Sequence, residues 1–164
     1  MNISISRADS ESIAQAVAGL SMQSKKVQSC FYTAIGRAIS RSRNRVAHDI
    51  AKELELPLKE IRRRVKSYKM PARGEAKFWC GLNGIPFDST GKPTQRGNDV
   101  EIKGVTFKNA YIAKTKLGET IVISKATGGR AMIEIHGEAT RIILQRLPYY
   151  MRTEFDKNFS QILN

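Results

Sequence analysis

Residues that build metal and redox sites are scarce in this sequence. The 164 residues include only two cysteines and two histidines. Cys30 and Cys80 each lie among apolar or aromatic neighbours, and neither belongs to a Cys-x-x-Cys or Cys/His spacing. This pattern argues against a zinc site and against a disulfide framework. We therefore expect both thiols to be small buried hydrophobic groups, and we expect His48 and His136 to be isolated from any metal site.

Long hydrophobic runs are absent as well. No stretch approaches the roughly 20 apolar residues that a membrane-spanning helix needs. Residues 1–9 are polar and show no signal peptide. Internal repeats, low-complexity tracts and coiled-coil heptads are also missing. These features favour a soluble protein that is made in the cytoplasm and has no membrane partner.

Acidic residues are few compared with basic ones. The chain holds 28 Lys+Arg against 15 Asp+Glu, a net charge of +13. With 41% hydrophobic and 26% charged residues, the composition is otherwise that of an ordinary globular protein. The excess of positive charge therefore concerns partners rather than fold, and it favours phosphate backbones or acidic surfaces.

Catalytic motifs are not recognisable either. Gly84 and Gly91 do not have the spacing of a phosphate-binding loop, and Pro93 stands where that motif needs Ser or Thr. Glu134 and Glu138 could be written as a carboxylate pair, but nothing nearby suggests an activated water. We predict that the protein is not an enzyme and takes no cofactor or metal.

The strongest periodic signal predicts one long amphipathic helix. Its apolar residues recur at helical spacing on one stripe, namely Val27, Phe31, Ile35, Ile39, Val46, Ile50 and Leu54. The opposite face carries Arg37, Arg41, Arg45, His48 and Lys52. Pro57 is expected to end the helix, because proline cannot donate to the helical ladder and disfavours helix at the preceding residue.

A second, shorter helix is expected directly after Pro57, since proline is favourable in the first turn of a helix. Its apolar face would comprise Leu58, Ile61 and Val65, and its basic residues are Arg62, Arg63 and Arg64. The segment from Arg37 to Arg73 contains 12 Lys+Arg and 4 Asp+Glu, which is +8 of the net +13. We predict that Arg37, Arg41, Arg45, Lys52 and Arg62–Arg64 form one surface for DNA or an acidic partner.

The second half of the chain is rich in β-branched and aromatic residues. Strands are expected over residues 77–82, 100–102, 105–107, 110–114, 120–125 and 132–135. Lys103-Gly104 is typical of a tight hairpin turn, and Thr127–Arg130 reads as another turn. We expect these strands to form a small antiparallel sheet.

The segment 83–99 is predicted to be a long mobile loop. It contains glycine and proline at Gly84, Pro86, Gly91, Pro93 and Gly97. A loop of this length inside a compact domain is usually functional. We expect it to contact a neighbouring subunit through Gly84, Pro86, Phe87, Gly91 and Pro93.

The two ends of the chain are expected to be helical. Asp9 or Ser10 would cap a short helix over Ile13–Leu20, and residues 139–164 would form a helix that Pro148 splits. The predicted fold class is α+β. Residues 1–26 would form an N-terminal arm, and residues 27–164 a single domain.

Residues 51–66 also match the apolar spacing of a DNA-reading helix-turn-helix. Three features weigh against that interpretation. Glu55 occupies the turn position where such motifs favour glycine, the first helix is about seven turns long, and the following strands have no wing-like composition.

A family resemblance favours another function. The run Ala34-Ile-Gly-Arg-Ala-Ile-Ser-Arg-Ser, continued by Val46-Ala and a basic second helix, resembles the opening of the minor tail protein Z family of lambdoid phages and prophages. Downstream, Val105-Thr-Phe107, Asn109-Ala-Tyr-Ile112, the Leu117-Gly118 turn and Thr120-Ile-Val-Ile123 are similar to that family's strands. The Met132–Ile135 strand and a C-terminal helix with Phe159 complete the order, over about residues 28–163.

The resemblance implies a non-enzymatic virion protein that completes the tail at its head-proximal end. It implies a sixfold ring that is assembled in the host cytoplasm and helps to join head and tail and to seat the DNA end. Its partners would be copies of itself, the tail terminator or tail tube, and neck connector proteins, with sequence-independent contact to phage DNA. The alternatives are a small helix-turn-helix regulator using residues 51–66, and a head-tail connector or stopper protein.

Overall fold

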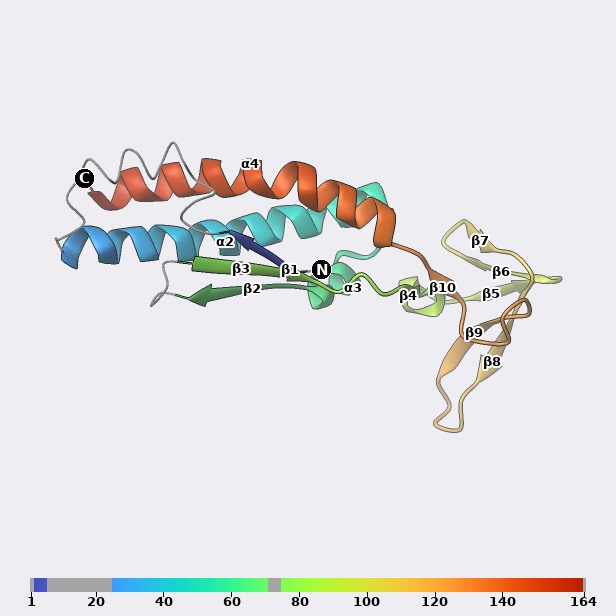
Figure 1. Cartoon of the computed structure of the whole chain (residues 1–164). Helices are drawn as coiled ribbons and strands as arrows, with labels where there is room; N and C mark the ends of the chain where they lie inside the picture. The colour runs from blue at the N-terminus through green and yellow to red at the C-terminus, as the bar shows by residue number, and fades with distance from the viewer. Residues whose placement is uncertain (1, 6–24, 71–74, 164) are drawn as a thin grey trace. The chain divides into compact units, whose positions relative to one another are not determined.

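The computed structural model describes residues 2–5, 25–70 and 75–163 (Figure 1). The short helix predicted over Ile13–Leu20 lies outside these residues. The chain divides into two compact units, residues 1–82 with 138–164, and residues 83–137. We call them unit 1 and unit 2. The predicted α+β class is confirmed, whereas the single domain expected over 27–164 stays a prediction, because compact units within a chain need not be separate domains.

Unit 1 combines helices with a three-stranded antiparallel sheet. Its elements are β1 (Asn2–Ile5), α2 (Lys25–Glu53), α3 (Leu58–Arg64), β2 (Val65–Met70), β3 (Glu75–Cys80) and α4 (His136–Leu163). The strand order is β1-β3-β2. Among the described helices, none is both long and apolar enough to cross a membrane.

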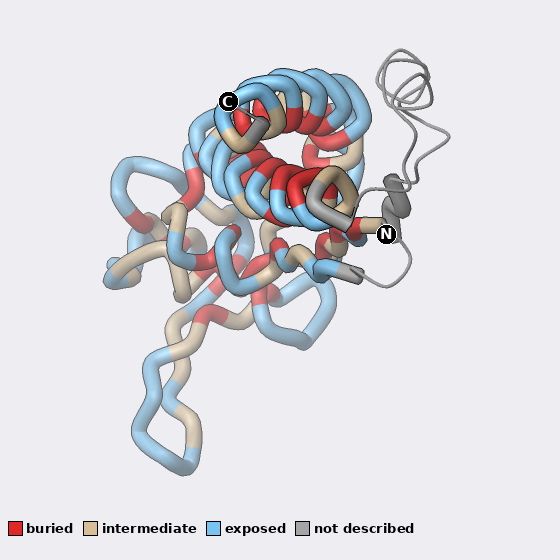
Figure 2. Tube along the Cα trace, turned by 90° about the vertical axis from the view of Figure 1, so that its left-hand side faces the viewer, coloured by how far each residue is buried: buried red, intermediate tan, exposed pale blue. Residues whose placement is uncertain are grey.

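Helix α2 is the centre of unit 1. It contacts β2 and β3 on one side, and α4 runs antiparallel along it on another (Figure 1). In the end-on view, buried residues of the two helices face one another (Figure 2). Small residues bring the elements close: Ala34 and Ala38 are fully buried, and a Cβ on Gly36 would lie 3.0 Å from the Lys69 side chain of β2. Aromatic rings also pack between α2 and α4. The rings of Phe31 and Phe155 meet edge to face, with 5.4 Å between their centroids.

The long helix ends before Pro57, not at it. The Leu56 amide donates to the Ala51 carbonyl and the Glu55 amide donates to the Lys52 carbonyl, while Glu55 has a φ of 52°. These two bonds around a left-handed residue make a Schellman motif, which ends a helix by satisfying its last carbonyls. The helix therefore stops at Glu53.

Three further features of unit 1 differ from the sequence predictions. Val65 begins strand β2 instead of continuing α3, and β2 pairs with β3 from Val65–Cys80 to Met70–Glu75. Strand β1 was not predicted. Helix α4 continues through Pro148, because Leu147 and Met151 on either side are buried and hold the helix in place.

Unit 2 consists of short strands around a small apolar core. Its elements are β4 (Ile85–Pro86), the 3-10 helix η3 (Phe87–Thr90), β5 (Thr94–Arg96), β6 (Asp99–Ile102), β7 (Val105–Phe107), β8 (Ala110–Lys114), β9 (Thr120–Ser124) and β10 (Met132–Ile133). The sheets are β5-β6-β7, β8-β9 and β10-β4. Both predicted hairpins are confirmed, and Lys103 and Gly104 have the positive φ angles, 51° and 82°, that a type I′ turn requires.

The predicted long loop over 83–99 is wrong. This segment supplies β4, η3 and β5, which pair with β10 and β6. Ile85 and Phe87 are buried, and Phe87 packs in one cluster with Val100, Ile102 and Val122. Apolar burial therefore overrides the glycine and proline content of the segment.

An ion pair between Asp88 and Arg130 links η3 to the segment that precedes β10. The Asp88 carboxylate accepts hydrogen bonds from Arg130 Nε at 3.0 Å and from the Val122 amide at 3.3 Å. Burial raises the pKa of Asp88, but the bonds from Arg130 and Val122 outweigh burial and hold this pKa below its ordinary value.

Candidate nucleic-acid interface

Seven basic residues of α2 and α3 form the candidate interface, which we call the basic surface. They are Arg37, Arg41, Arg45, Lys52, Arg62, Arg63 and Arg64. All are exposed except Arg64, which is partly buried. The four α2 residues recur at helical spacing on the side turned away from the core. The prediction that these side chains point outward is confirmed for the exposed six.

Arg41 and Arg45 are not free, however. Arg41 Nη1 lies 3.1 Å and Arg45 Nη2 lies 2.9 Å from the two carboxylate oxygens of Glu154 on α4. The Glu154 side chain is 5% exposed, whereas the two arginine side chains are about half exposed. Arg45 also lies over the Tyr150 ring at 5.4 Å. These two arginines therefore fasten α2 to α4 as well as contributing charge to the surface.

The α3 arginines are also partly engaged. Arg63 and Arg64 approach the Glu60 carboxylate at 3.1 and 3.8 Å. By contrast, Arg37, Lys52 and Arg62 make no ion pair with any residue in the described ranges. Within the described ranges only two carboxylates, Glu60 and Glu154, pair with these seven basic residues.

The acidic residues near the end of α2 face α4. Arg146 reaches Asp49 at 3.1 Å, and the Tyr150 hydroxyl donates to Asp49 at 2.7 Å. This hydrogen bond to the Asp49 carboxylate raises the pKa of Tyr150. Arg141 pairs with Glu53 at 3.3 Å. Asp49 and Glu53 are thus paired with arginines of α4, which leaves the outer face of α2 positive.

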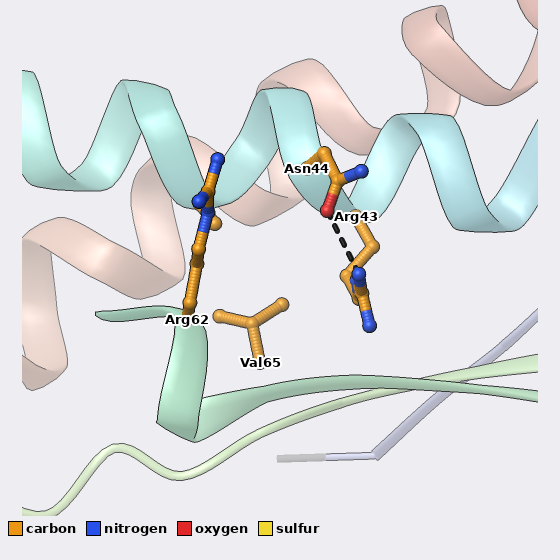
Figure 3. Close-up of a pocket in the computed structure, with 5 residues that line it drawn as sticks. Arg43, Asn44, Arg62 and Val65 are labelled. Atoms are coloured by element: carbon orange, nitrogen blue, oxygen red, sulfur yellow. Dashed lines mark hydrogen bonds between the residues drawn. The ribbon is translucent and has the colours of Figure 1, made fainter. Parts of the chain in front are cut away.

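A small open pocket lies beside the basic surface (Figure 3). It has a volume of about 310 Å3 and is lined by Arg43, Asn44, Ala47, Arg62 and Val65. Arg43 hangs from α2 and donates to the Asn44 side-chain oxygen at 2.8 Å, while Arg62 rises from α3 towards α2 (Figure 3). The sequence predictions did not include Arg43 and Asn44, since only the position of α3 beside α2 brings them to Arg62.

Some features of α3 and of the turn before it fit the helix-turn-helix alternative, and others do not. Glu55 does adopt the left-handed turn conformation that glycine favours in such motifs. However, α3 has seven residues, about two turns, and the chain passes directly into β2. Its arginines Arg63 and Arg64 are held by Glu60. This interpretation stays a prediction.

The residues predicted for an inter-subunit loop support unit 2 itself. Phe87 is 1% exposed. A Cβ on Gly91 would lie 2.8 Å from Ile102 Cγ2, and a Cβ on Gly84 would lie 3.2 Å from the Ile133 carbonyl oxygen. Pro86 pairs with Met132 in the sheet of β4 and β10. Pro93 is partly buried. Phe87 is therefore unavailable to a neighbouring subunit, and the two glycines allow close internal packing.

The cysteine prediction is confirmed. Cys30 and Cys80 are both buried. Burial raises the pKa of Cys80 to about 11, which suppresses its thiolate. Among the described residues, no group of His, Cys, Asp and Glu is arranged to hold a metal ion.

Comparison of the chain with protein-family models, curated proteins and solved structures found no match. The resemblance to the minor tail protein Z family therefore remains a prediction from the sequence.

Proposed function

We propose that the protein is a non-enzymatic structural component of a tailed phage particle. It would complete the tail at the head-proximal end, as a sixfold ring that contacts the tail terminator or tube and the neck connector. The observation that carries this proposal is the basic surface, six of whose seven basic side chains are exposed. The order of sequence elements that resembles the tail protein family supports it.

The proposed role of the basic surface is to neutralise DNA phosphates without reading sequence. Arg37, Lys52 and Arg62 are exposed and have no acidic partner among the described residues. Contacts of this kind position DNA but carry no base information. A protein that lines a DNA-filled channel needs this property, because any sequence can lie opposite it.

Unit 2 offers exposed apolar side chains for ring formation. The β8-β9 hairpin is a two-stranded sheet, and its residues Tyr111 and Leu117 are 43% and 89% exposed. Bonds to Gln95, Asn98 and Ala131 already occupy parts of its two edges, so its exposed side chains are what it can offer a neighbouring subunit. We propose that this hairpin, rather than the segment 83–99, contacts the next subunit.

A gene deletion in the parent phage tests the function. The deletion should allow heads and tails to form but should abolish infectious particles, and a plasmid copy should restore them. A copy with Arg37→Glu and Lys52→Glu should fail to restore infectivity. The matched control, Lys92→Glu with Lys108→Glu, reverses two exposed charges of unit 2 outside the β8-β9 hairpin and should succeed. Normal particles after deletion would refute the proposal.

Binding to duplex DNA separates this function from the regulator alternative. Affinity should fall by about 0.9 log units per neutralised phosphate for each tenfold rise in salt. Unrelated sequences should bind alike. One duplex bound about a thousandfold more tightly than others would instead indicate specific recognition. A cryo-electron microscopy map of the particle would distinguish a tail ring from a connector or stopper.

A further inference from the structure

The pocket beside the basic surface contains two guanidinium groups and no carboxylate. Its lining residues are Arg43, Asn44, Ala47, Arg62 and Val65. Arg43 donates to the neutral amide of Asn44, and Arg62 has no ion pair with any residue that the structure describes. The acid of α3, Glu60, is occupied by Arg63 and Arg64.

Two like charges that open into one space repel each other. The repulsion grows as water is displaced by protein, because the effective dielectric constant falls. An anion between the two guanidinium groups would turn this repulsion into attraction. The positive charge of the pocket is therefore uncompensated when no anionic ligand is bound.

We propose that this pocket binds a phosphate group. A guanidinium presents parallel N–H donors that match the oxygens of a phosphate, so two arginines can hold one group from two sides. The Asn44 amide supplies further donors at the rim. The volume of about 310 Å3 is at the lower end of the range of about 300–1,000 Å3 for ligand pockets, which suits a phosphate with little attached to it.

The position of the pocket indicates where the phosphate would come from. Asn44 lies three residues after Arg41, so the two side chains are neighbours on the helix surface. A nucleic-acid backbone that follows the basic surface would pass the mouth of the pocket. Assignment to backbone phosphate rests on the proposed function, whereas binding of a free phosphate ion does not.

The test uses the full chain and charge-removing variants of similar shape. The pocket variant is Arg43→Gln with Arg62→Gln. Arg37→Gln removes an exposed charge from α2 outside the pocket, and Lys59→Gln does the same on α3. Fluorescence of Trp79, the single tryptophan, verifies that each variant keeps unit 1 folded.

The first arm is a titration with inorganic phosphate at low salt, followed by calorimetry and by the NMR signal of the Asn44 side-chain amide. The wild type should show one saturable site. The pocket variant should bind at least about tenfold more weakly, the effect of losing one charged hydrogen-bond partner. The Arg37→Gln and Lys59→Gln variants should bind as the wild type does.

The second arm measures affinity for a mixed-sequence duplex over a salt series. The pocket variant should lower the slope of log affinity against log salt by about 0.9, the loss of one phosphate contact, relative to Lys59→Gln. Such a loss without saturable binding of free phosphate would support the pocket and identify backbone phosphate as its ligand. Saturable free phosphate that the pocket variant loses, with no duplex effect, would support the pocket and identify a free anion.

The pocket proposal is overturned if the pocket variant equals its controls in both arms. Failure of the proposed function looks different. In that case the wild type does not bind duplex DNA, or Arg37→Gln leaves the salt slope unchanged, while the phosphate arm still reports on the pocket.

Discussion

Removing the two arginines that hold Glu154 should destabilise unit 1 more than neutralising Glu154 itself. The carboxylate is 5% exposed and lies 3.1 and 2.9 Å from Arg41 and Arg45, whose side chains are 51% and 50% exposed. The three side chains therefore differ in their access to water. Each arginine can turn to water when its partner is lost, but the glutamate cannot.

The structure sets the expected magnitudes. Glu154→Gln keeps the shape and deletes the charge, so it should cost about 1–2 kcal/mol of the free energy of unfolding, the net value of two hydrogen bonds with exposed partners. Arg41→Met with Arg45→Met leaves a buried carboxylate without a cation and should cost about 3–5 kcal/mol. Adding Glu154→Met to that pair should recover most of the loss, because no buried charge then remains.

Urea unfolding followed by the fluorescence of Trp79 measures these values. Trp79 lies on β3 and is the only tryptophan, so the signal reports on unit 1. Arg37→Met is the control, since this exposed residue has no ion pair within the described ranges, and it should change stability by less than about 0.5 kcal/mol. A double arginine variant that is no less stable than Glu154→Gln would refute the proposed role of Arg41 and Arg45 in compensating the buried carboxylate.

Phe87→Ala should destabilise unit 2 by about 3–5 kcal/mol, seen as faster amide exchange over residues 83–137, whereas unchanged exchange would restore the loop interpretation. Pro148→Ala should stabilise unit 1 by about 1–2 kcal/mol in urea, because it restores a helix donor; a loss would mean that the packing of α4 requires proline. Because the pKa of Asp88 is lowered in the folded state from 3.8, its carboxylate stabilises unit 2 above that pH and ceases to do so as pH falls through the folded value. The stability difference between wild type and Asp88→Asn, measured by NMR exchange, should therefore be constant near neutrality and disappear in acid. Cys80, with its pKa of about 11, should react with iodoacetamide at pH 8 only at the rate of unfolding, and rapid labelling of the native protein would contradict its burial.

Local signals in the sequence were sufficient for several elements. The long helix α2 has enough turns for its apolar and basic stripes to be distinct, and it forms as predicted, except that it ends at Glu53. The two hairpins are also confirmed, because alternation of side chains and a turn at Lys103-Gly104 act over a few residues. Both cysteines lie in apolar runs and both are buried.

Other elements depend on partners far away in the chain. Strands β1 and β2 are short, and both exist by pairing with β3. Ile85 and Phe87 stand in a segment rich in glycine and proline, and their burial depends on β10 and on the core of unit 2. In a local reading these residues resemble a loop, because the apolar contacts that order them lie elsewhere in the chain.

The candidate interface likewise depends partly on local sequence and partly on tertiary packing. The sequence by itself determined that the protein is basic, that α2 has one charged face, and that the charge continues past Pro57 into α3. Only the tertiary structure decided which of those charges are available. Glu154 is 113 residues from Arg41, and Arg43 meets Arg62 at one pocket only because α3 packs beside α2. Helical periodicity fixes the direction of a side chain from its neighbours along the chain, whereas the charge that faces it depends on how distant segments pack.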